Sequence, residues 1–265
     1  MIDKRCKLCL IESRVSDLIR LGYDDKIPDL LEEISNNLKT GKNRDELFVD
    51  TFNYIKKLVK NEDPYNDLKN NLNKIGKKVS LSIRDELIKN NWDVNMALKF
   101  SAAANILDSN VLGYEPVNIN NALYDEPKLF GDINIPKNEI IYLVLDNSGE
   151  VYIDLLLKES LIRNGYNVRT VMRRESYEID VSIKDEIIPD IVTNGNYSPL
   201  RNISNGFLIA KGIANLEAYL FSDHRLRTLH LFRAKCFVLA DKFNVKKNTP
   251  IIINSENLLK IFIYA

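Results

Sequence analysis

The chain has 265 residues, of which 45% are hydrophobic and 28% are charged. This composition excludes a disordered chain and predicts a folded, soluble protein with a sizeable core. Lysine plus arginine and aspartate plus glutamate number 37 each, so the formal net charge is +0. This balance argues against a protein with an overall basic surface for nucleic acid or for a membrane.

No apolar run approaches the roughly 20 residues that a membrane-spanning helix needs. Residues 1–12 alternate charged and single apolar residues and lack the apolar centre of a secretory signal. We therefore expect a cytoplasmic protein with neither a membrane nor a nucleic-acid partner. Its three cysteines cannot form a paired disulfide framework, and two of them, Cys6 and Cys9, form a CxxC motif.

The first third of the chain has the pattern of a helical domain. From Cys6 to Asp108 apolar residues recur at helical spacing, and turn-forming residues such as Gly22 and Pro64 separate the periodic segments. The last two helices are expected around residues 68–88 and 93–107, with Gly76 as a candidate break in the first. We predict an all-helical domain over residues 1–112.

Residues 113–138 contain several prolines without periodicity, which indicates a connecting segment. Short apolar runs then alternate with amphipathic segments, a pattern typical of βαβ units. The strands are expected at residues 140–146, 167–173, 190–194, 207–212, 228–234 and 249–253. The predicted fold class is α/β, a Rossmann-like, mainly parallel sheet with helices on both faces over residues 139–265, preceded by the N-terminal all-helical domain.

The first predicted strand ends in Asp146-Asn147-Ser148-Gly149-Glu150, and a helix is expected over residues 151–164. In doubly wound sheets, ligands bind outside the carboxyl ends of the strands. Asp146 and Asn147 carry the oxygen atoms that Mg²⁺ or Mn²⁺ prefers. Gly149 and the helix amides after it favour an anion such as phosphate. An Asx turn followed by a helix-capping acid explains the same residues at least as well.

Later strand ends carry further candidates. Asp180 follows the second strand, where it either completes a metal site or caps a helix beginning at Val181. Lys211 and Gly212 end the fourth strand directly before a helix, an arrangement that suits phosphate, although a surface lysine explains it too. Lys235 occupies the equivalent place after the fifth strand, and two cations at adjacent strand ends support an anion site better than either alone.

Several familiar sites do not fit. The turn after the first strand has one glycine, whereas nicotinamide and S-adenosylmethionine sites favour a glycine-rich turn. Ser148 stands where a haloacid-dehalogenase-type phosphatase has its second aspartate. With only His224 and His230, a histidine-rich zinc site or a catalytic triad is disfavoured. Cys6 and Cys9 are half of a zinc site at best, so helix packing is favoured over a redox or metal role.

Taken together and in this order, these motifs resemble the metal-dependent, ARMT-like damage-control phosphatase family (domain of unknown function eighty-nine), in particular its prokaryotic branch. Each motif is weak alone, but the ordered set is specific and covers nearly the whole chain. The motifs are Cys6-Lys-Leu-Cys9, Ala104-Asn105-Ile-Leu-Asp108, Asp146-Asn147-Ser-Gly149-Glu150 with Asp154, Asp180, Asn194-Gly195, Lys211-Gly212 with Asn215 and Glu217, and Lys235-Cys236.

The resemblance implies a divalent metal, Mn²⁺, Co²⁺, Ni²⁺ or Mg²⁺, between the helical and Rossmann-like domains. The implied catalytic residues are the metal ligands Asp146, Asn147 and Asp180, together with Glu150 at the substrate site. The implied substrate- and phosphate-binding residues are Lys211, Gly212, Asn215 and Lys235, with Asn105 and Asp108 reaching the cleft from the helical side. Either Glu150 or Asp154 is expected to position water or to protonate the leaving oxygen.

The chain departs from the family pattern at two places. Ile213 and Ala214 precede Asn215 where the family has Gln and Gly, and Ile179 stands where an Asn precedes the third metal carboxylate. Neither change removes an implied ligand. The expected function is that of a divalent-metal-dependent phosphatase acting on small phosphorylated metabolites, either sugar phosphates or damaged phosphometabolites. The alternatives are an S-adenosylmethionine-dependent carboxyl methyltransferase, which the missing glycine-rich turn disfavours, and a non-catalytic phosphometabolite-binding protein.

Overall fold

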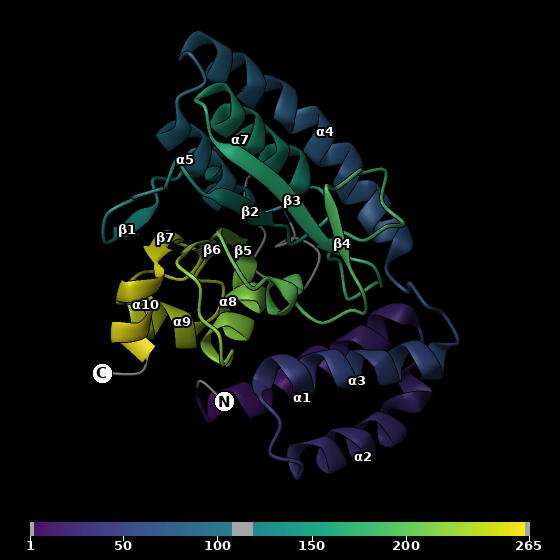
Figure 1. Cartoon of the computed structure of the whole chain (residues 1–265). Coiled ribbons are helices and arrows are strands. Elements are labelled where there is room, and N and C mark those ends of the chain that lie inside the picture. The colour runs from purple at the N-terminus through teal and green to yellow at the C-terminus, as the bar shows by residue number, and fades with distance from the viewer. Residues whose placement is uncertain (1–2, 108–118, 263–265) are drawn as a thin grey trace.

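The computed structural model describes residues 3–107 and 119–262. Within these residues a seven-stranded sheet of order β1-β7-β6-β5-β2-β3-β4 forms the centre of the molecule (Figure 1). The strands are β1 (Lys128–Phe130), β2 (Ile140–Val144), β3 (Asn167–Arg173), β4 (Ile191–Thr193), β5 (Phe207–Lys211), β6 (Thr228–Arg233) and β7 (Pro250–Asn254). Neighbouring strands pair in parallel except β6 and β7, which are antiparallel. The predicted α/β fold class is confirmed.

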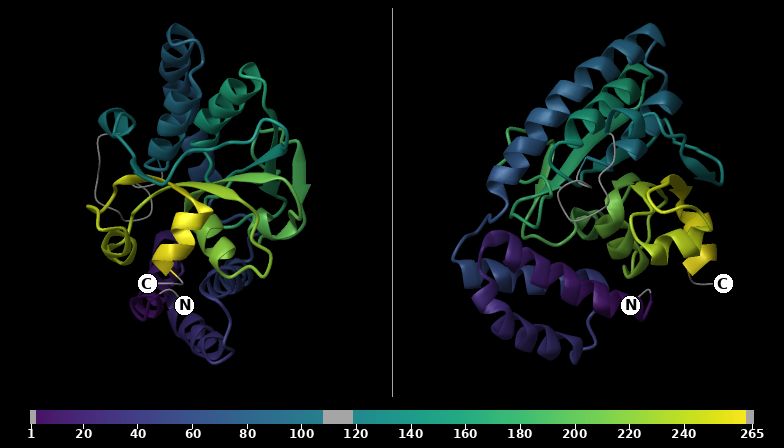
Figure 2. Two further views of the ribbon diagram at one scale, coloured as in Figure 1. Left: turned by 60° about the vertical axis from the view of Figure 1, so that its left-hand side comes forward. Right: turned by 180° about the vertical axis from the view of Figure 1, so that it is seen from behind.

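Helices cover both faces of the sheet (Figure 2). One face packs against α4 (Asn66–Lys89), α5 (Val94–Ala104) and α7 (Val151–Arg163), and the other against α8 (Gly212–Leu220), α9 (Phe237–Phe243) and α10 (Ser255–Phe262). A short helix, α6 (Ile119–Ala122), precedes β1. Successive residues of a strand point to opposite faces of the sheet. Ile209 packs in the core under α4, α5 and α7, and Ala210 packs in the core under α8, α9 and α10. This alternation buries β5 on both sides, as expected of a central parallel strand.

The N-terminal helices form a separate helical layer beside the sheet and its covering helices, at the bottom of Figure 1. They are α1 (Arg5–Leu21), α2 (Ile27–Leu38) and α3 (Arg44–Val59). Their apolar faces enclose a separate core with Leu10, Leu30 and Phe52 at its centre. Tyr177 and Ile179, from the segment after β3, belong to the same core. The helical layer is therefore packed directly onto the segment that carries Asp180.

Local sequence signals account for the limits of several helices. Asn43 and Glu46 form a capping box at the start of α3, and the Asp93 side chain accepts a hydrogen bond from the Met96 amide, 2.7 Å away, at the start of α5. α1 ends at Gly22, which has the left-handed conformation (φ 77°) that glycine adopts without strain. These caps satisfy backbone groups that helix ends otherwise leave unpaired.

The six strands predicted from sequence all occur in the structure, as do the helices expected around residues 68–88, 93–107 and 151–164. Two details differ. β1 lies in the segment predicted as a connection, and α4 continues without a break through Gly76. The domain limits at residues 112 and 138 stay predictions. α5 and most of α4 nevertheless pack against the sheet with α7, whereas the start of α4, at Leu68 and Leu72, belongs to the core of α1–α3.

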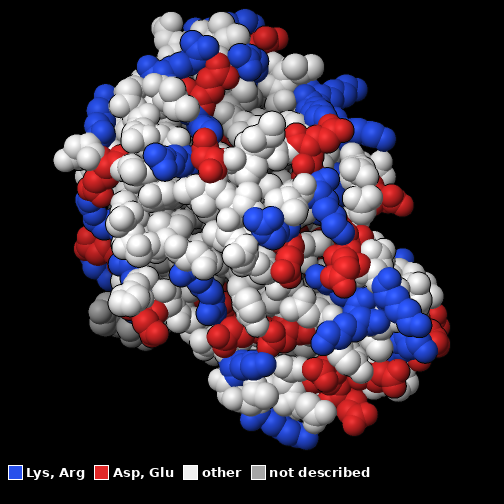
Figure 3. Space-filling view, turned by 45° about the vertical axis from the view of Figure 1, so that its right-hand side comes forward, with Lys and Arg blue, Asp and Glu red and all other residues white. Residues whose placement is uncertain are grey.

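No helix within residues 3–107 and 119–262 has the length and apolar character needed to cross a bilayer. Positive and negative side chains are interspersed over the face of the molecule drawn in Figure 3.

Candidate active site

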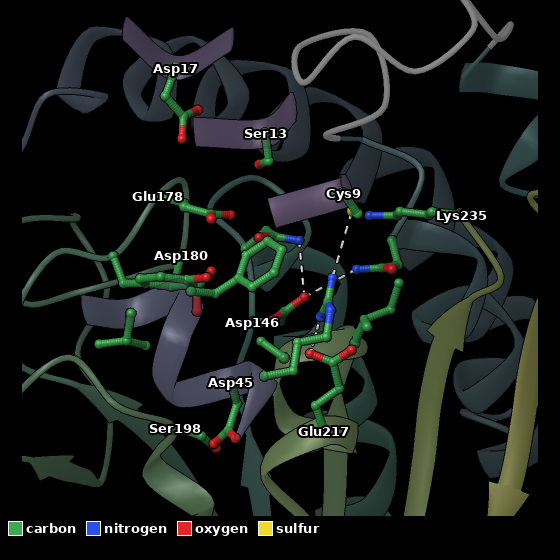
Figure 4. A pocket seen from close by; sticks show the side chains of 18 of the residues that line it. Cys9, Ser13, Asp17, Asp45, Asp146, Glu178, Asp180, Ser198, Glu217 and Lys235 are labelled. Atoms are coloured by element: carbon green, nitrogen blue, oxygen red, sulfur yellow. Dashed lines mark hydrogen bonds and ion pairs between the residues drawn. The ribbon is translucent and has the colours of Figure 1, made fainter. Parts of the chain in front are cut away.

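A cavity of about 310 Å³ lies between the helical layer and the carboxyl ends of the parallel strands (Figure 4). Strand register brings these ends together, since Val144 at the end of β2 pairs with Val171 of β3 and with Ala210 of β5. The sheet side contributes Asn105, Asp146, Asn147, Arg173, Tyr177, Glu178, Asp180, Ser198, Ile213, Ala214, Glu217 and Lys235. The helical layer contributes Cys9, Glu12, Ser13, Ser16, Asp17, Arg20, Arg44, Asp45, Phe48 and Val49.

The three residues expected to bind metal meet at one edge of this cavity. An isolated antiparallel bridge joins Asn147 to Asp180. The Val181 amide donates to the Asp146 carbonyl (2.8 Å), and the Ser148 amide donates to the Ile179 carbonyl (2.9 Å). No helix begins at Val181, so the helix-capping interpretation of Asp180 is wrong. Backbone pairing therefore brings Asp146, Asn147 and Asp180 together although they are far apart in the chain.

The donor set of this site suits a hard divalent cation. Asp146, Asn147 and Asp180 are 5%, 7% and 4% exposed, and they offer two carboxylates and one carboxamide oxygen. Burial raises the pKa of Asp180 to about 7. The positive charge of Arg173 lowers this pKa, and the negative charge of Glu178 raises it further. The Arg173 guanidinium lies 2.6 Å from the Asp180 carboxylate. A bound cation would offset the cost of burying these negative charges.

Because one of the three side chains is an amide, the site differs from one built only of ionisable ligands. In the described part of the chain, no group of three or more His, Cys, Asp or Glu side chains is arranged to hold a metal ion. Mg²⁺ and Mn²⁺ accept carbonyl oxygens, such as that of a carboxamide, as well as carboxylate oxygens. The residues present therefore fit such an ion.

Asn105, the residue directly after α5, reaches the site from the α/β part of the molecule, since α5 packs on the sheet. Its Nδ2 donates to Asp146 Oδ2 (3.2 Å) and to Glu150 Oε2 (2.8 Å), and its Oδ1 accepts from the Arg233 amide (3.3 Å). Glu150 is 1% exposed and contacts Asp146 through Asn105. Asp108, expected to act beside Asn105, lies outside the described residues.

Gly212, at the start of α8, lies against the Asp146 carboxylate. It has φ +73°, and a Cβ atom built there would lie 1.7 Å from Asp146 Oδ2. Only glycine leaves room for the carboxylate at this point. Asn215 holds the same turn in place, because its Nδ2 donates to the Leu145 carbonyl (3.2 Å) and to the Lys211 carbonyl (2.7 Å).

The two lysines expected to bind phosphate occupy different environments. Lys235 lines the cavity. Lys211 is fully buried, with its ammonium 3.1 Å from Asp154 and donating to the Ser101 carbonyl. Burial raises the pKa of Asp154 to about 7, although the positive charge of Lys211 lowers it. Lys211, Gly212, Asn215 and Glu150 are not among the described residues that line the cavity.

Sequence reasoning missed most of the helical wall. In Figure 4, Ser13 and Asp17 of α1 point toward the space that Asp146, Glu178 and Asp180 border. The residues that α1 contributes, at positions 9, 12, 13, 16, 17 and 20, recur at intervals of three and four along the helix, with 12 and 13 and 16 and 17 as adjacent pairs. That spacing puts them on one helix face. The signal was visible in the sequence, but a polar stripe on a helix ordinarily faces solvent.

The sequence analysis also did not predict Arg44, whose guanidinium extends from α3 into the wall of the cavity. Arg44 forms an ion pair with Glu217 of α8, lies 4.0 Å from the centre of the Phe48 ring, and approaches the sulfur of Cys9 at 3.8 Å. Glu217 entered the sequence analysis only as part of the family pattern. Cys6 is buried and Cys9 half-buried in α1, and neither forms a disulfide within the described residues.

Comparison with known proteins identifies the family of the chain. The family model described as the damage-control phosphatase ARMT1-like domain matches residues 2–194. The chain belongs to this family. A relative from Archaeoglobus fulgidus named damage-control phosphatase is 24% identical, with 92% of this chain and 96% of the relative covered. An uncharacterized protein of Methanocaldococcus jannaschii is 22% identical over 95% of both chains.

A solved structure shows the same fold. The crystal structure of a DUF89 family protein from Pyrococcus horikoshii superposes with a TM-score of 0.64 at 18% sequence identity, covering 94% of this chain and 97% of that one. Membership of the damage-control phosphatase ARMT1-like family confirms the resemblance inferred from the ordered motifs. The roles of individual residues stay predictions.

Proposed function

We propose that this protein is a divalent-metal-dependent phosphatase that hydrolyses small phosphorylated metabolites, either sugar phosphates or damaged phosphometabolites. The observation that carries the proposal is the convergence of Asp146, Asn147 and Asp180 at one edge of a cavity of about 310 Å³ that Lys235 also lines. Family membership and the name of the Archaeoglobus relative support the reaction class.

In this proposal Asp146, Asn147 and Asp180 hold Mn²⁺, Co²⁺, Ni²⁺ or Mg²⁺. When bound, the metal would polarise a phosphoryl oxygen and lower the pKa of a water molecule. Asn105 orients the Asp146 carboxylate, and Glu150 holds Asn105 in turn. A ligand carboxylate supported in this way presents its oxygen in a fixed direction.

Lys235 and the N-terminal amides of α8 neutralise the charge that develops on the phosphoryl group. Lys211 acts differently in this proposal from the direct phosphate contact that the resemblance implies. Its buried ammonium balances the carboxylates of Asp154 and Glu150 behind the site. The hydroxyl and carboxylate groups on α1, including Ser13 and Ser16, face the rest of the substrate. Such groups favour a hydroxyl-rich leaving group over an apolar one.

Phosphate release from a substrate panel tests this proposal. Protein stripped with a chelator is supplied singly with Mn²⁺, Co²⁺, Ni²⁺ or Mg²⁺ and assayed with sugar phosphates and an aryl phosphate. We expect metal-restored hydrolysis that falls about a hundredfold or more in Asp146→Ala, since that change removes a metal ligand. Asp241→Ala, on the exposed side of α9, serves as the matched control and keeps wild-type activity.

Wild-type turnover by a folded Asp146→Ala variant would contradict the metal assignment. Absence of hydrolysis with every metal, despite folded protein, would contradict the phosphatase proposal. Titration with S-adenosylmethionine and with a sugar phosphate would then separate methyl transfer from non-catalytic binding.

A further inference from the structure

A buried polar cluster lies behind the turn that carries Asp146 and Asn147. We propose that this cluster, made of Lys69, Asn73, Ser148, Ser182 and Asp185, positions the metal ligands and so sets the affinity of the site for a divalent cation. The inference rests on the proposed function, because it assigns a role to residues around the same metal site. The contacts of each member carry the argument.

Asp185 is the centre of the cluster. Its Oδ1 accepts hydrogen bonds from the Ser148 hydroxyl (2.7 Å) and from Asn73 Nδ2 (2.8 Å). Its Oδ2 accepts from the Ser182 amide (2.9 Å). One buried carboxylate thus joins α4, the turn after β2 and the segment that follows Asp180.

Lys69 supplies the balancing charge from α4 and is 1% exposed. Its ammonium lies 3.2 Å from Asp185 Oδ2 and 3.0 Å from Asp63 Oδ2, and it donates to the Ser182 hydroxyl (3.2 Å). The second oxygen of Asp63 accepts from the Ser176 hydroxyl (2.7 Å). Both carboxylates that pair with Lys69 therefore hold the segment of residues 176–185.

The cluster is connected to the metal ligands by backbone contacts. Asn73 Oδ1 accepts from the Gly149 amide (2.8 Å), which holds the turn after Asn147 against α4. The Val181 amide donates to the Asp146 carbonyl (2.8 Å), so the two ligand-bearing segments share one framework. The relative positions of Asp146, Asn147 and Asp180 depend on this framework.

These residues act through others rather than on substrate. None of the five cluster members is among the described residues that line the cavity. A buried polar network whose members are hydrogen-bonded is rigid, because each group loses its partner if another moves. Outer partners of metal ligands fix ligand orientation, and their loss costs roughly 10–100-fold in metal affinity. They are therefore positioning residues.

The Asp185→Asn variant tests the proposal. The amide keeps the shape of the side chain but removes its charge and one acceptor, so either the contact with Asn73 Nδ2 or the contact with the Ser182 amide is lost. The dissociation constant for Mn²⁺ alone is measured by calorimetry on the full chain, without substrate. We expect it to rise about 10–100-fold, with a smaller change in KM for the phosphate substrate at saturating Mn²⁺.

Asp190→Asn is a matched control. Asp190 also accepts from a backbone amide (Thr170, 2.6 Å), accepts from a hydroxyl (Thr170, 2.7 Å) and pairs with a lysine (Lys158, 2.5 Å). Neither it nor these partners line the cavity. We expect a smaller shift of the urea unfolding midpoint, because the Asp190 side chain is 38% exposed, and an unchanged Mn²⁺ dissociation constant. Equal weakening of Mn²⁺ binding in both variants, or none in Asp185→Asn, would overturn the proposal.

If Asp185→Asn fails to fold, a pair of less disruptive variants tests the same proposal. Ser148→Ala removes one hydrogen bond to Asp185. Thr170→Val removes the corresponding hydroxyl bond to the Asp190 carboxylate and also the bond from the Asp190 amide. Only Ser148→Ala is expected to weaken Mn²⁺ binding severalfold; equal effects would overturn the inference. Wild-type protein that binds Mn²⁺ but releases no phosphate would contradict the proposed function alone. Wild-type protein that binds no Mn²⁺ would contradict both.

Discussion

His230, in β6, shows what burial does to a titratable side chain without a polar partner. It is fully buried, and neither ring nitrogen has a hydrogen-bond partner among the described residues. Its ring meets the edge of Tyr219 with centroids 4.8 Å apart. Burial lowers the pKa of His230 to about 3, so the folded protein holds a neutral imidazole there.

Replacing His230 is expected to change how stability depends on pH. Below a pH of about 6.5 the unfolded chain binds a proton at this histidine while the folded chain does not. The free energy of unfolding therefore falls by about 1.4 kcal/mol per pH unit from this group alone as the pH drops toward 3. Urea unfolding of His230→Leu between pH 4 and 7.5 should lack that contribution.

His224→Leu is the control, because His224 is exposed. Its pH dependence should match that of the wild type, so that the difference between the two variants isolates the effect of burial. An identical slope in His230→Leu and wild type would show that His230 titrates normally in the folded state.

At the scale of elements, α4 and the turn after β2 make an unusually close contact. A Cβ atom built on Gly76 would lie 2.0 Å from the Gly149 carbonyl oxygen, and one built on Gly149 would lie 2.7 Å from the Leu72 carbonyl oxygen. The helix therefore touches the turn with backbone against backbone. Gly76, which the sequence marks as a weak point of the helix, is what permits this contact.

Gly76→Ala is expected to destabilise the protein even though alanine favours helix. Helix propensity alone would stabilise by about 1 kcal/mol. The added methyl group must instead displace the Gly149 backbone, and overpacking of this kind costs about 1–3 kcal/mol. Because Gly149 follows Asn147 closely, metal-dependent turnover should fall as well.

The control for this change lies on the exposed side of the same helix. Asn71→Ala should leave activity unchanged and stability equal or slightly higher in urea unfolding. A stability gain in Gly76→Ala similar to that of Asn71→Ala would contradict the close contact.

At the scale of the whole molecule, ion pairs join the helical layer to the α/β part. Arg14 of α1 pairs with Glu178, Arg44 of α3 with Glu217, and Asp45 with Arg201. Arg14 has no exposed surface, also pairs with Asp17 and lies over the Phe48 ring at 5.1 Å. These pairs border the cavity, so the same contacts that join the layers shape the site.

Arg14→Leu is expected to cost about 3–5 kcal/mol of unfolding free energy, because it removes the buried cation from the Asp17 and Glu178 carboxylates and leaves Asp17 only Arg20, 3.9 Å away. Arg163→Ala removes an exposed i,i+4 pair with Glu159 and should cost less than about 1 kcal/mol. Urea unfolding of both variants measures the difference. Equal, small losses would show that the interlayer pairs contribute little.

Part of the site was predictable because it follows from local chain properties. Asp146 and Asn147 follow an apolar strand directly, and Lys235 follows another, so strand prediction places them at one edge of the sheet. The sequence did not decide whether Asp180 joins Asp146 and Asn147 or caps a helix, because its seven-residue separation from β3 allows either a turn or a helix start. Only the backbone pairing with Asn147 decided between them.

The sequence by itself determined most of the helices and strands, β1 excepted, together with the α/β class and the motifs that mark the family. Apolar periodicity and end caps are local properties of the chain, so they can be recognised without knowing which segments pack together. Tertiary structure alone decided that α4 and α5 pack on the sheet, that Lys211 is buried while Lys235 lines the cavity, and that a polar face of α1 forms its wall. These outcomes depend on which surfaces meet, because periodicity reveals that a helix has two faces but not what each one covers.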